Sequence, residues 1–267
     1  NTNKKAMVEQ YKIVFGDLDF EVVDNHDWFK DINYIDFLST VGKHVPMRQM
    51  VNREFVQSRL SEEGSGISYA EFSYVLIQAY DFLHLNREKG VTLQLCGSDQ
   101  WGNSIAGVDL IRRVTGNATN VWTIPLVINK STGIKFGKSE DGAVWLDPAK
   151  TSPYKFYQFW LNVDDEGVED YLKIYTELPK EFIDDVMRRF NEDRSIRLAQ
   201  KTLAYEVTEL VHGKDIAESV KRVTKVLFGG ESYDKLTKDD FETLKSELEV
   251  INAKDHNLTD LLVEAKL

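Results

Sequence analysis

The chain has 267 residues, of which 42% are apolar and 29% charged, and its formal net charge is −11. This composition is typical of a globular protein, and the negative charge argues against binding nucleic acid by overall attraction, so such a contact would need local basic patches. No apolar run is long enough to cross a bilayer, no apolar signal core follows Asn1, and the single cysteine, Cys96, fits a reducing compartment. We therefore expect a cytoplasmic protein without membrane contact, and a mitochondrial matrix fits the same features.

Helices dominate the first ninety residues of the predicted structure. The pattern of apolar residues predicts, in chain order, a helix over 3–15, a short strand over 19–24, and amphipathic helices over 32–42 and 47–60. A loop over 61–66 follows. Ser68 and Glu71 then form a capping-box pattern in front of a strongly apolar helix that continues to about Leu85.

A βαβ unit is predicted next. Residues 91–95 form a strand, 96–104 a loop, 105–114 a helix and 121–128 a second strand. Ligands of parallel sheets bind at the carboxyl ends of the strands, which places the loop after residue 95 where a ligand would lie.

The second half of the chain is predicted to be almost entirely helical. A polar loop over 129–143 precedes Ser152 and Pro153, a hydroxyl cap followed by proline at the first helical position. Helical patterns then continue to about Leu227, and short acidic helices follow a break over 228–234. The expected fold class is α/β, with a parallel-sheet domain over 1–150 and an all-α domain over 151–267.

Three polar side chains share one face of the helix around residues 72–83. At about 100° per residue, Tyr74, Gln78 and Asp81 fall within roughly 60° of one another. A buried amide or carboxylate is costly unless it is paired. Either the three groups and the nearby backbone satisfy one another, or a small polar ligand supplies the partners, and the triplet alone does not decide between these explanations.

Polar residues also gather at the predicted end of the first strand. Gln94 lies within that strand, and Asp99 and Gln100 follow it, with Gly97 able to let a ligand approach the backbone closely. The pattern is not the GxGxxG of a dinucleotide site, and a simple turn, with Trp101 as a core anchor, is the alternative interpretation.

Two further groups of basic residues are candidates for phosphate contact. In KFGKS, Lys135 and Lys138 flank a glycine before Ser139, and lysines can neutralise phosphate charge that develops in a transition state. The candidate nucleic-acid contacts are Arg112 with Arg113 and a second basic cluster that begins at Arg188. For each of these groups, solvated loop or helix faces are the more frequent explanation. This second basic cluster comprises Arg188, Arg189, Arg194, Arg197 and Lys201.

Together these segments resemble the bacterial and mitochondrial type of tyrosyl-tRNA synthetase, a family of class I aminoacyl-tRNA synthetases. The resemblance covers nearly the whole chain in order and spacing. It is carried by YVLIQAYD (74–81), LQLCGSDQWGN (93–103), TIPLV (123–127) with KFGKS (135–139), and TSPYKFYQFW (151–160). It implies that the first domain is the later part of a Rossmann-like catalytic domain, with dimer-interface residues near Tyr69, and that the second is the α-helical anticodon-side domain.

The resemblance also implies residue roles. Tyr74 and Gln78 would hold the ammonium group of L-tyrosine, Asp81 would accept its phenol proton, and Gln94 would support the pocket. A site built to hydrogen-bond a phenol discriminates against phenylalanine by a factor of roughly 10⁴–10⁵. The remaining roles concern the substrate carboxylate, ATP and tRNA. Gln100 would face the carboxylate, Gly97 and Asp99 would bind ATP, Lys135, Lys138 and Ser139 would stabilise the departing pyrophosphate, and Arg112 and Arg113 would contact the tRNA.

The implied reaction has two steps. The tyrosine carboxylate attacks the α-phosphate of ATP, which carries Mg²⁺, and the tyrosyl group then passes to tRNA(Tyr). No tightly bound cofactor and no protein metal site are expected, and positioning with charge stabilisation carries the chemistry. The resemblance further implies a homodimer.

The chain departs from the family pattern in several places. Cys96 stands where the family usually has glycine, and none of the five histidines lies in a HIGH-like motif. We therefore expect a fragment that lacks the N-terminal HIGH region and the C-terminal S4-like domain, and that is inactive alone. A tryptophanyl-type synthetase and a non-catalytic RNA-binding or structural module are the alternatives.

Overall fold

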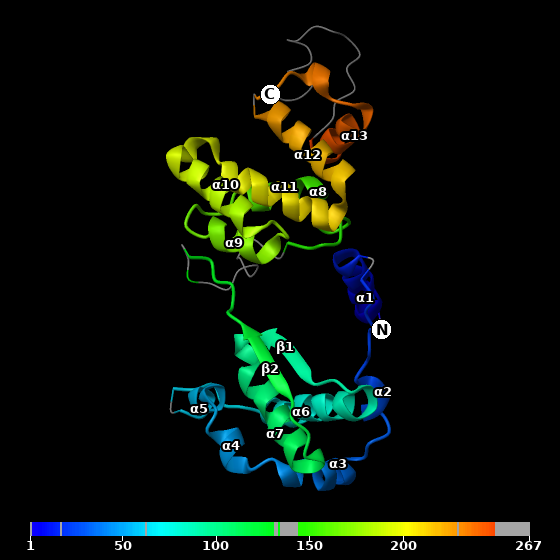
Figure 1. The fold of residues 1–267 in the computed structure, drawn as a ribbon. Coiled ribbons are helices and arrows are strands. Elements are labelled where there is room, and N and C mark those ends of the chain that lie inside the picture. Colours follow the sequence, from blue (N-terminus) through cyan, green and yellow to red (C-terminus); the bar gives the residue numbers. More distant parts are fainter. Residues whose placement is uncertain are drawn as a thin grey trace. The chain divides into compact units, whose positions relative to one another are not determined.

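The computed structural model describes residues 2–16, 18–61, 63–130, 133, 144–228 and 230–248, with only the backbone of Glu54. The chain divides into two compact units (Figure 1). One, here called the sheet unit, is Glu21–Val127. The other, here called the helical unit, combines Asn1–Phe20 with Ile128–Leu267. The domain boundary expected near residue 150 remains a prediction, since these units divide at 127/128.

The sheet unit contains a parallel two-stranded sheet with a crossover helix. Its elements are α2 (His26–Phe29), α3 (Tyr34–Thr40), α4 (Met47–Val51), α5 (Glu54–Leu60), α6 (Tyr69–Lys89), β1 (Leu93–Gly97), α7 (Trp101–Thr115) and β2 (Asn120–Ile124). Leu93 pairs with Asn120 and Gly97 with Ile124, in parallel register. The predicted βαβ unit is therefore confirmed.

The core of the sheet unit lies between α6 and α7. Phe82 and Leu83 of α6 pack with Leu110 and Ile111 of α7 in one buried cluster. Gly107 permits this approach, because a Cβ added there would lie 3.0 Å from the ring of Phe82. Close packing of the two helices fixes which face of α6 remains available for a ligand.

The ends of α6 form as its sequence predicts. The Ser68 hydroxyl accepts from the backbone N–H of Glu71, whose carboxylate accepts in return from the N–H of Ser68. This capping box supplies partners to two backbone donors that the first turn of a helix leaves free. Gly90 ends the helix with φ +69°, a left-handed conformation that suits glycine.

Three predicted elements of the sheet unit differ in the structure. The strand predicted over 19–24 is wrong, since these residues are irregular. The helix predicted over 47–60 is two helices, because Arg53 has extended backbone with ψ 136° between α4 and α5. The loop predicted over 96–104 is mostly ordered, as a 3₁₀ turn over Ser98–Gln100 leads directly into α7.

The helical unit is built around α11. Its helices are α1 (Thr2–Phe15), α8 (Pro153–Leu161), α9 (Val168–Tyr175), α10 (Lys180–Glu192), α11 (Leu198–His212), α12 (Lys214–Leu227) and α13 (Lys238–Glu247). α11 contacts α1, α8, α9, α10 and α12. The predicted start of α8 is confirmed, because the Ser152 hydroxyl accepts from the N–H of Lys155 and Pro153 begins the helix.

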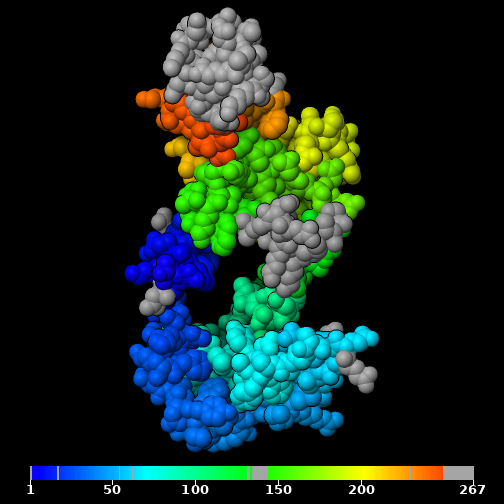
Figure 2. All heavy atoms as spheres, turned by 180° about the vertical axis from the view of Figure 1, so that it is seen from behind, coloured from blue at the N-terminus to red at the C-terminus, as the bar shows by residue number. Residues whose placement is uncertain are grey.

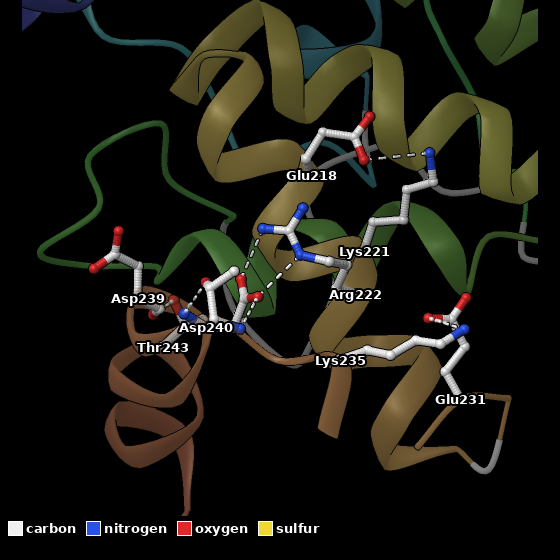
Figure 3. Close-up of polar contacts among 9 residues, drawn as sticks. Glu218, Lys221, Arg222, Glu231, Lys235, Asp239, Asp240 and Thr243 are labelled. Atoms are coloured by element: carbon white, nitrogen blue, oxygen red, sulfur yellow. Dashed lines mark hydrogen bonds and ion pairs between the residues drawn. The ribbon is translucent and has the colours of Figure 1, made fainter. Parts of the chain in front are cut away.

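A two-point ion pair attaches α13 to α12 (Figure 3). Nε and Nη2 of Arg222 donate to the two carboxylate oxygens of Asp240 at 2.9 and 3.0 Å. The Asp240 side chain is fully buried and also accepts from the backbone N–H of Thr237. Burial would raise the pKa of Asp240, but these hydrogen bonds hold it well below its usual range.

Candidate functional site

The polar face of α6 is more open than its sequence predicts. Tyr74 is 56% exposed, and Gln78 and Asp81 are half-buried. The three side chains are not fully buried, because α7 packs on a different face of the helix, where Val75, Ala79 and Phe82 lie. Within the described part of the chain, the Gln78 side chain makes no hydrogen bond, so its amide is available to a ligand.

Asp81, in contrast, has partners within the chain. Trp28 Nε1 donates to Oδ1 at 2.9 Å, and Asn25 Nδ2 donates to Oδ2 at 3.2 Å. The Trp28 ring stacks on His84, one turn further along α6, with centroids 4.4 Å apart. Burial raises the pKa of Asp81, while the two hydrogen bonds and the nearby His84 oppose that rise. The fold thus supplies two of the partners that the sequence left open.

Asn25 and Trp28 are site residues that sequence reasoning missed. They lie in DNHDW (24–28), next to the region predicted to be a strand. No local pattern could connect them with Asp81, because the Trp28–Asp81 contact spans 53 residues. The cluster of polar side chains around a tryptophan was the one available signal.

The carboxyl end of β1 brings the second set of predicted residues together. A Cβ added at Gly97 would lie 2.8 Å from Oδ1 of Asp99, so the glycine provides room for that carboxylate. Oε1 of Gln94 is buried and has no hydrogen-bond partner among the residues that the structure describes. Cys96 directs its sulfur at α7, with Sγ 3.3 Å from Oγ of the buried Ser104.

Gln100 is held by Asn103, which is itself held by Arg53 from the break between α4 and α5. Asn103 Nδ2 donates to Gln100 Oε1 at 3.1 Å, and Arg53 Nη1 donates to Asn103 Oδ1 at 2.6 Å. Arg53 also donates to the backbone oxygen of Gly102. Arg53 and Asn103 were not among the predicted site residues. The guanidinium is half-buried, and burial lowers its pKa.

The predicted basic contacts are only partly available. Arg112 is 68% exposed and pairs with Asp109 at 2.9 Å, whereas Arg113 donates to the backbone oxygen of His44. In the helical unit, Arg188, Arg189 and Arg194 all lie in ion pairs with neighbouring acids. These pairs favour solvated helix faces for the second group.

The KFGKS residues Lys135, Lys138 and Ser139 lie outside the described residues. On either side of them, Lys130 Nζ lies 2.6 Å from Oδ2 of Asp170, and Thr151 Oγ1 accepts from the N–H of Trp145 at 3.0 Å. Both of these anchoring contacts belong to the helical unit.

Two kinds of feature, a metal-binding cluster and a membrane-spanning helix, are absent from the described ranges. No group of three or more His, Cys, Asp or Glu side chains is placed to hold a metal ion. Within the same ranges, no helix combines the length and apolar character that a membrane span requires.

Residues 1–229 match the family described as class I tRNA synthetases (W and Y). A tyrosine--tRNA ligase of Limosilactobacillus reuteri is 48% identical over 234 residues, which are 87% of this chain and 55% of that protein. One of Lactobacillus acidophilus is 43% identical over 99% of this chain and 63% of its own length. This chain therefore spans between about half and two thirds of the length of these relatives.

A solved structure gives the same result for the fold. A C-terminally truncated mitochondrial tyrosyl-tRNA synthetase of Coccidioides posadasii is 31% identical with a TM-score of 0.66, and the match covers 83% of this chain and 65% of that one. The likeness includes an α/β part and a helical part, as the sequence predicts.

Proposed function

Because this chain belongs to the class I tRNA synthetases for tryptophan and tyrosine, we propose that it is part of a tyrosine--tRNA ligase. The enzyme activates L-tyrosine with ATP and transfers it to tRNA(Tyr). The observation that carries the choice of tyrosine is the half-buried carboxylate of Asp81, held by Trp28 and Asn25 on the same face of α6 as Gln78. All the named relatives above are tyrosine enzymes.

Asp81 selects the phenol of the substrate. An ionised carboxylate has about four lone-pair sites, so two donors from Asn25 and Trp28 leave room for a third. The phenol O–H is that donor. Phenylalanine would leave this acceptor unpaired in a half-buried position, which costs free energy and excludes it. Tyr74 and Gln78, whose polar groups lie along the same helix face, bind the substrate ammonium.

ATP binds at the carboxyl end of β1, as the Mg²⁺ complex in which the nucleotide arrives. Gly97 allows the nucleotide to approach the backbone closely. The Asp99 carboxylate accepts hydrogen bonds from the ribose hydroxyls. Gln94 supports the pocket from within the strand. Lys135, Lys138 and Ser139 stabilise the charge that develops on the departing pyrophosphate.

The tRNA contacts Arg112, whose guanidinium is well exposed on α7. Arg113 acts indirectly, by holding the helix end that carries Arg112. It donates a hydrogen bond to the backbone oxygen of His44, which joins the end of α7 to the turn after α3. Charging of tRNA places the protein in the cytoplasm or the mitochondrial matrix.

A homodimer forms through the surface of α3 and the start of α6. Tyr34 and Tyr69 are 57% and 62% exposed, and their hydroxyls lie 2.7 Å apart. They line an apolar hollow of about 280 Å³ together with Phe37 and Leu76. Figure 2 shows the blue residues of α2 and α3 on the same unit as the cyan residues of α6. Replacing Tyr69 with aspartate should shift the protein to monomers in light scattering.

The function is tested by ATP–pyrophosphate exchange with each standard amino acid in turn. The chain of 267 residues and the full-length product of its gene are assayed side by side. We expect exchange with tyrosine alone in the full-length protein. Exchange with tryptophan would overturn the choice of substrate, and absence of exchange in both proteins would favour a non-catalytic module.

A further inference from the structure

We propose that Arg53 and Asn103 are positioning residues that fix the side-chain amide of Gln100 with its NH₂ group toward the substrate carboxylate. The inference rests on the proposed function and on the role that the family resemblance implies for Gln100, which is to face the substrate carboxylate. It adds two residues that decide how Gln100 does so.

The three side chains form one directed series of hydrogen bonds, here called the relay. Arg53 Nη1 donates to Asn103 Oδ1 at 2.6 Å, and Asn103 Nδ2 donates to Gln100 Oε1 at 3.1 Å. The direction follows from the chemistry of the first member, because a guanidinium has five N–H donors and no acceptor. Asn103 must therefore turn its oxygen to Arg53 and its nitrogen to Gln100.

The same logic fixes the last member. Since Gln100 uses Oε1 to accept from Asn103, its Nε2 hydrogens are left to point away from Asn103. An amide that presents donors suits a carboxylate or phosphate oxygen, whereas one that presents oxygen would repel it. The relay thus uses the donor-only guanidinium of Arg53 to make Gln100 present N–H donors to the substrate.

Local backbone structure places Arg53 for this task. The break between α4 and α5 falls at this residue, whose extended backbone sets it apart from both helices. Its guanidinium lies over Gly102 in the first turn of α7, where an added Cβ would lie 3.5 Å from Nη2. Asn103 belongs to the same turn of α7, directly after the 3₁₀ turn that carries Gln100.

The charge of Arg53 favours the same ligand. The guanidinium is half-buried, and it has no ion pair with any carboxylate in the described part of the chain. A partly buried cation without an anionic partner is unfavourable by itself, and a substrate carboxylate nearby would compensate it. The amino-terminal end of α7 adds a positive potential of the same sign.

A purely structural role is the competing explanation, since Arg53 also donates to the Gly102 backbone and so ties α5 to α7. The substitution Asn103→Asp separates the two. Aspartate keeps an oxygen for Arg53 and converts the contact into an ion pair, so the tie survives. It has no N–H for Gln100, which must turn its Nε2 toward residue 103 and its oxygen toward the substrate.

We expect Asn103→Asp to raise KM for tyrosine by about 10- to 100-fold in pyrophosphate exchange by the full-length protein, as loss of a hydrogen bond to a charged group would. KM for ATP and the midpoint of thermal unfolding should stay nearly unchanged. A structural tie alone predicts an unchanged KM for tyrosine, and that result would overturn the proposal.

Two controls sharpen the test. Asn52→Asp adds the same charge to the exposed residue before Arg53 without touching the relay, and should leave KM for tyrosine within about two-fold. In a Gln100→Ala background, Asn103→Asp should have little further effect, because its action passes through Gln100. A full additional loss there would show that Asn103 acts by another route and would also overturn the proposal.

The failure of the proposed function gives a different result. If the full-length unmodified protein shows no tyrosine-dependent exchange, the function and this inference both fail. If exchange is present and Asn103→Asp leaves KM for tyrosine unchanged, only the relay is wrong.

Discussion

Trp28 donates a hydrogen bond of 2.9 Å from its indole nitrogen to Oδ1 of Asp81, a residue of α6 that lies 53 positions later in the sequence. The same indole ring stacks on His84 at 4.4 Å. The short helix α2 is thereby fixed against the polar face of α6 at two points. One contact orients a carboxylate, and the other fixes the ring that orients it.

Trp28→Phe separates these two contacts. Phenylalanine retains a ring for His84 but has no N–H, so Asp81 loses one of its two donors. The pKa of Asp81 should then rise further, and its oxygen should be less well oriented toward the phenol. We expect discrimination between tyrosine and phenylalanine to fall roughly 10-fold, measured as the ratio of kcat/KM values in pyrophosphate exchange. Unchanged discrimination would assign Trp28 to packing alone.

Asp81→Asn tests the opposite effects of this residue on function and stability. Burial raises the pKa of Asp81, so the folded state keeps its proton to a higher pH than the unfolded chain does. Folding stability therefore falls as pH rises from the ordinary range through the raised pKa, and the full cost is present at neutral pH.

Because asparagine does not ionise, Asp81→Asn should remove that pH dependence. The free energy of unfolding at pH 7 should change by less than about 1 kcal/mol, since the group is only half-buried and removal of the ionisation cost is opposed by the loss of one acceptor for Trp28 or Asn25. Tyrosine binding should weaken strongly at the same time. Urea unfolding at several pH values and tyrosine titration check both parts, and the same pH dependence of stability in Asp81→Asn as in the unmodified protein would contradict its assignment to Asp81.

The local features of this fold were predictable because short-range chemistry controls them. Ser68 and Glu71 cap α6 as three-residue spacing predicts, and Gly116 ends α7 with φ +79°. The parallel pairing of β1 with β2 follows from the order strand, helix, strand.

The predictions that failed concern features that depend on contacts between residues distant in the sequence. Apolar periodicity continues through Asn52 and Arg53, yet the helix breaks there, and the Arg53 side chain reaches Asn103, which lies 50 residues away. The second set of missed residues follows the same rule, because Asn25 acts on Asp81 across 56 residues. Residue types at the site were readable, but the side chains that orient them were not.

Gly97→Ala should weaken ATP binding more than tyrosine binding. The new Cβ would lie 2.8 Å from Oδ1 of Asp99 and 3.5 Å from Cδ2 of Leu126, so the carboxylate must move. Asp99 would then no longer face the ribose in its present position. We expect KM for ATP to rise several-fold, with KM for tyrosine within about two-fold of its starting value. Equal changes in both constants would indicate a general distortion of the strand end instead.

The ion pair between Arg222 and Asp240 gives the last prediction, which concerns the attachment of α13. The Asp240 side chain is fully buried, whereas that of Arg222 is 35% exposed. Arg222→Met leaves a buried carboxylate without its cation, at a cost of roughly 3 kcal/mol. Asp240→Asn leaves a guanidinium that water can still reach, so it should cost less. Amide hydrogen exchange over residues 241–247 should rise more in Arg222→Met than in Asp240→Asn.

The acid sensitivity of α13 follows from the same pair. Since the pKa of Asp240 is held below its usual range, its contribution to stability is complete above that range and is lost as pH falls through the lowered pKa. Exchange in α13 should therefore accelerate in strong acid in the unmodified protein, and Arg222→Met should shift this transition to higher pH. Lys245→Met, which removes an exposed pair with Glu242, is the matched control and should change little. If Asp240→Asn opened α13 more than Arg222→Met, the buried carboxylate would not be the costly partner.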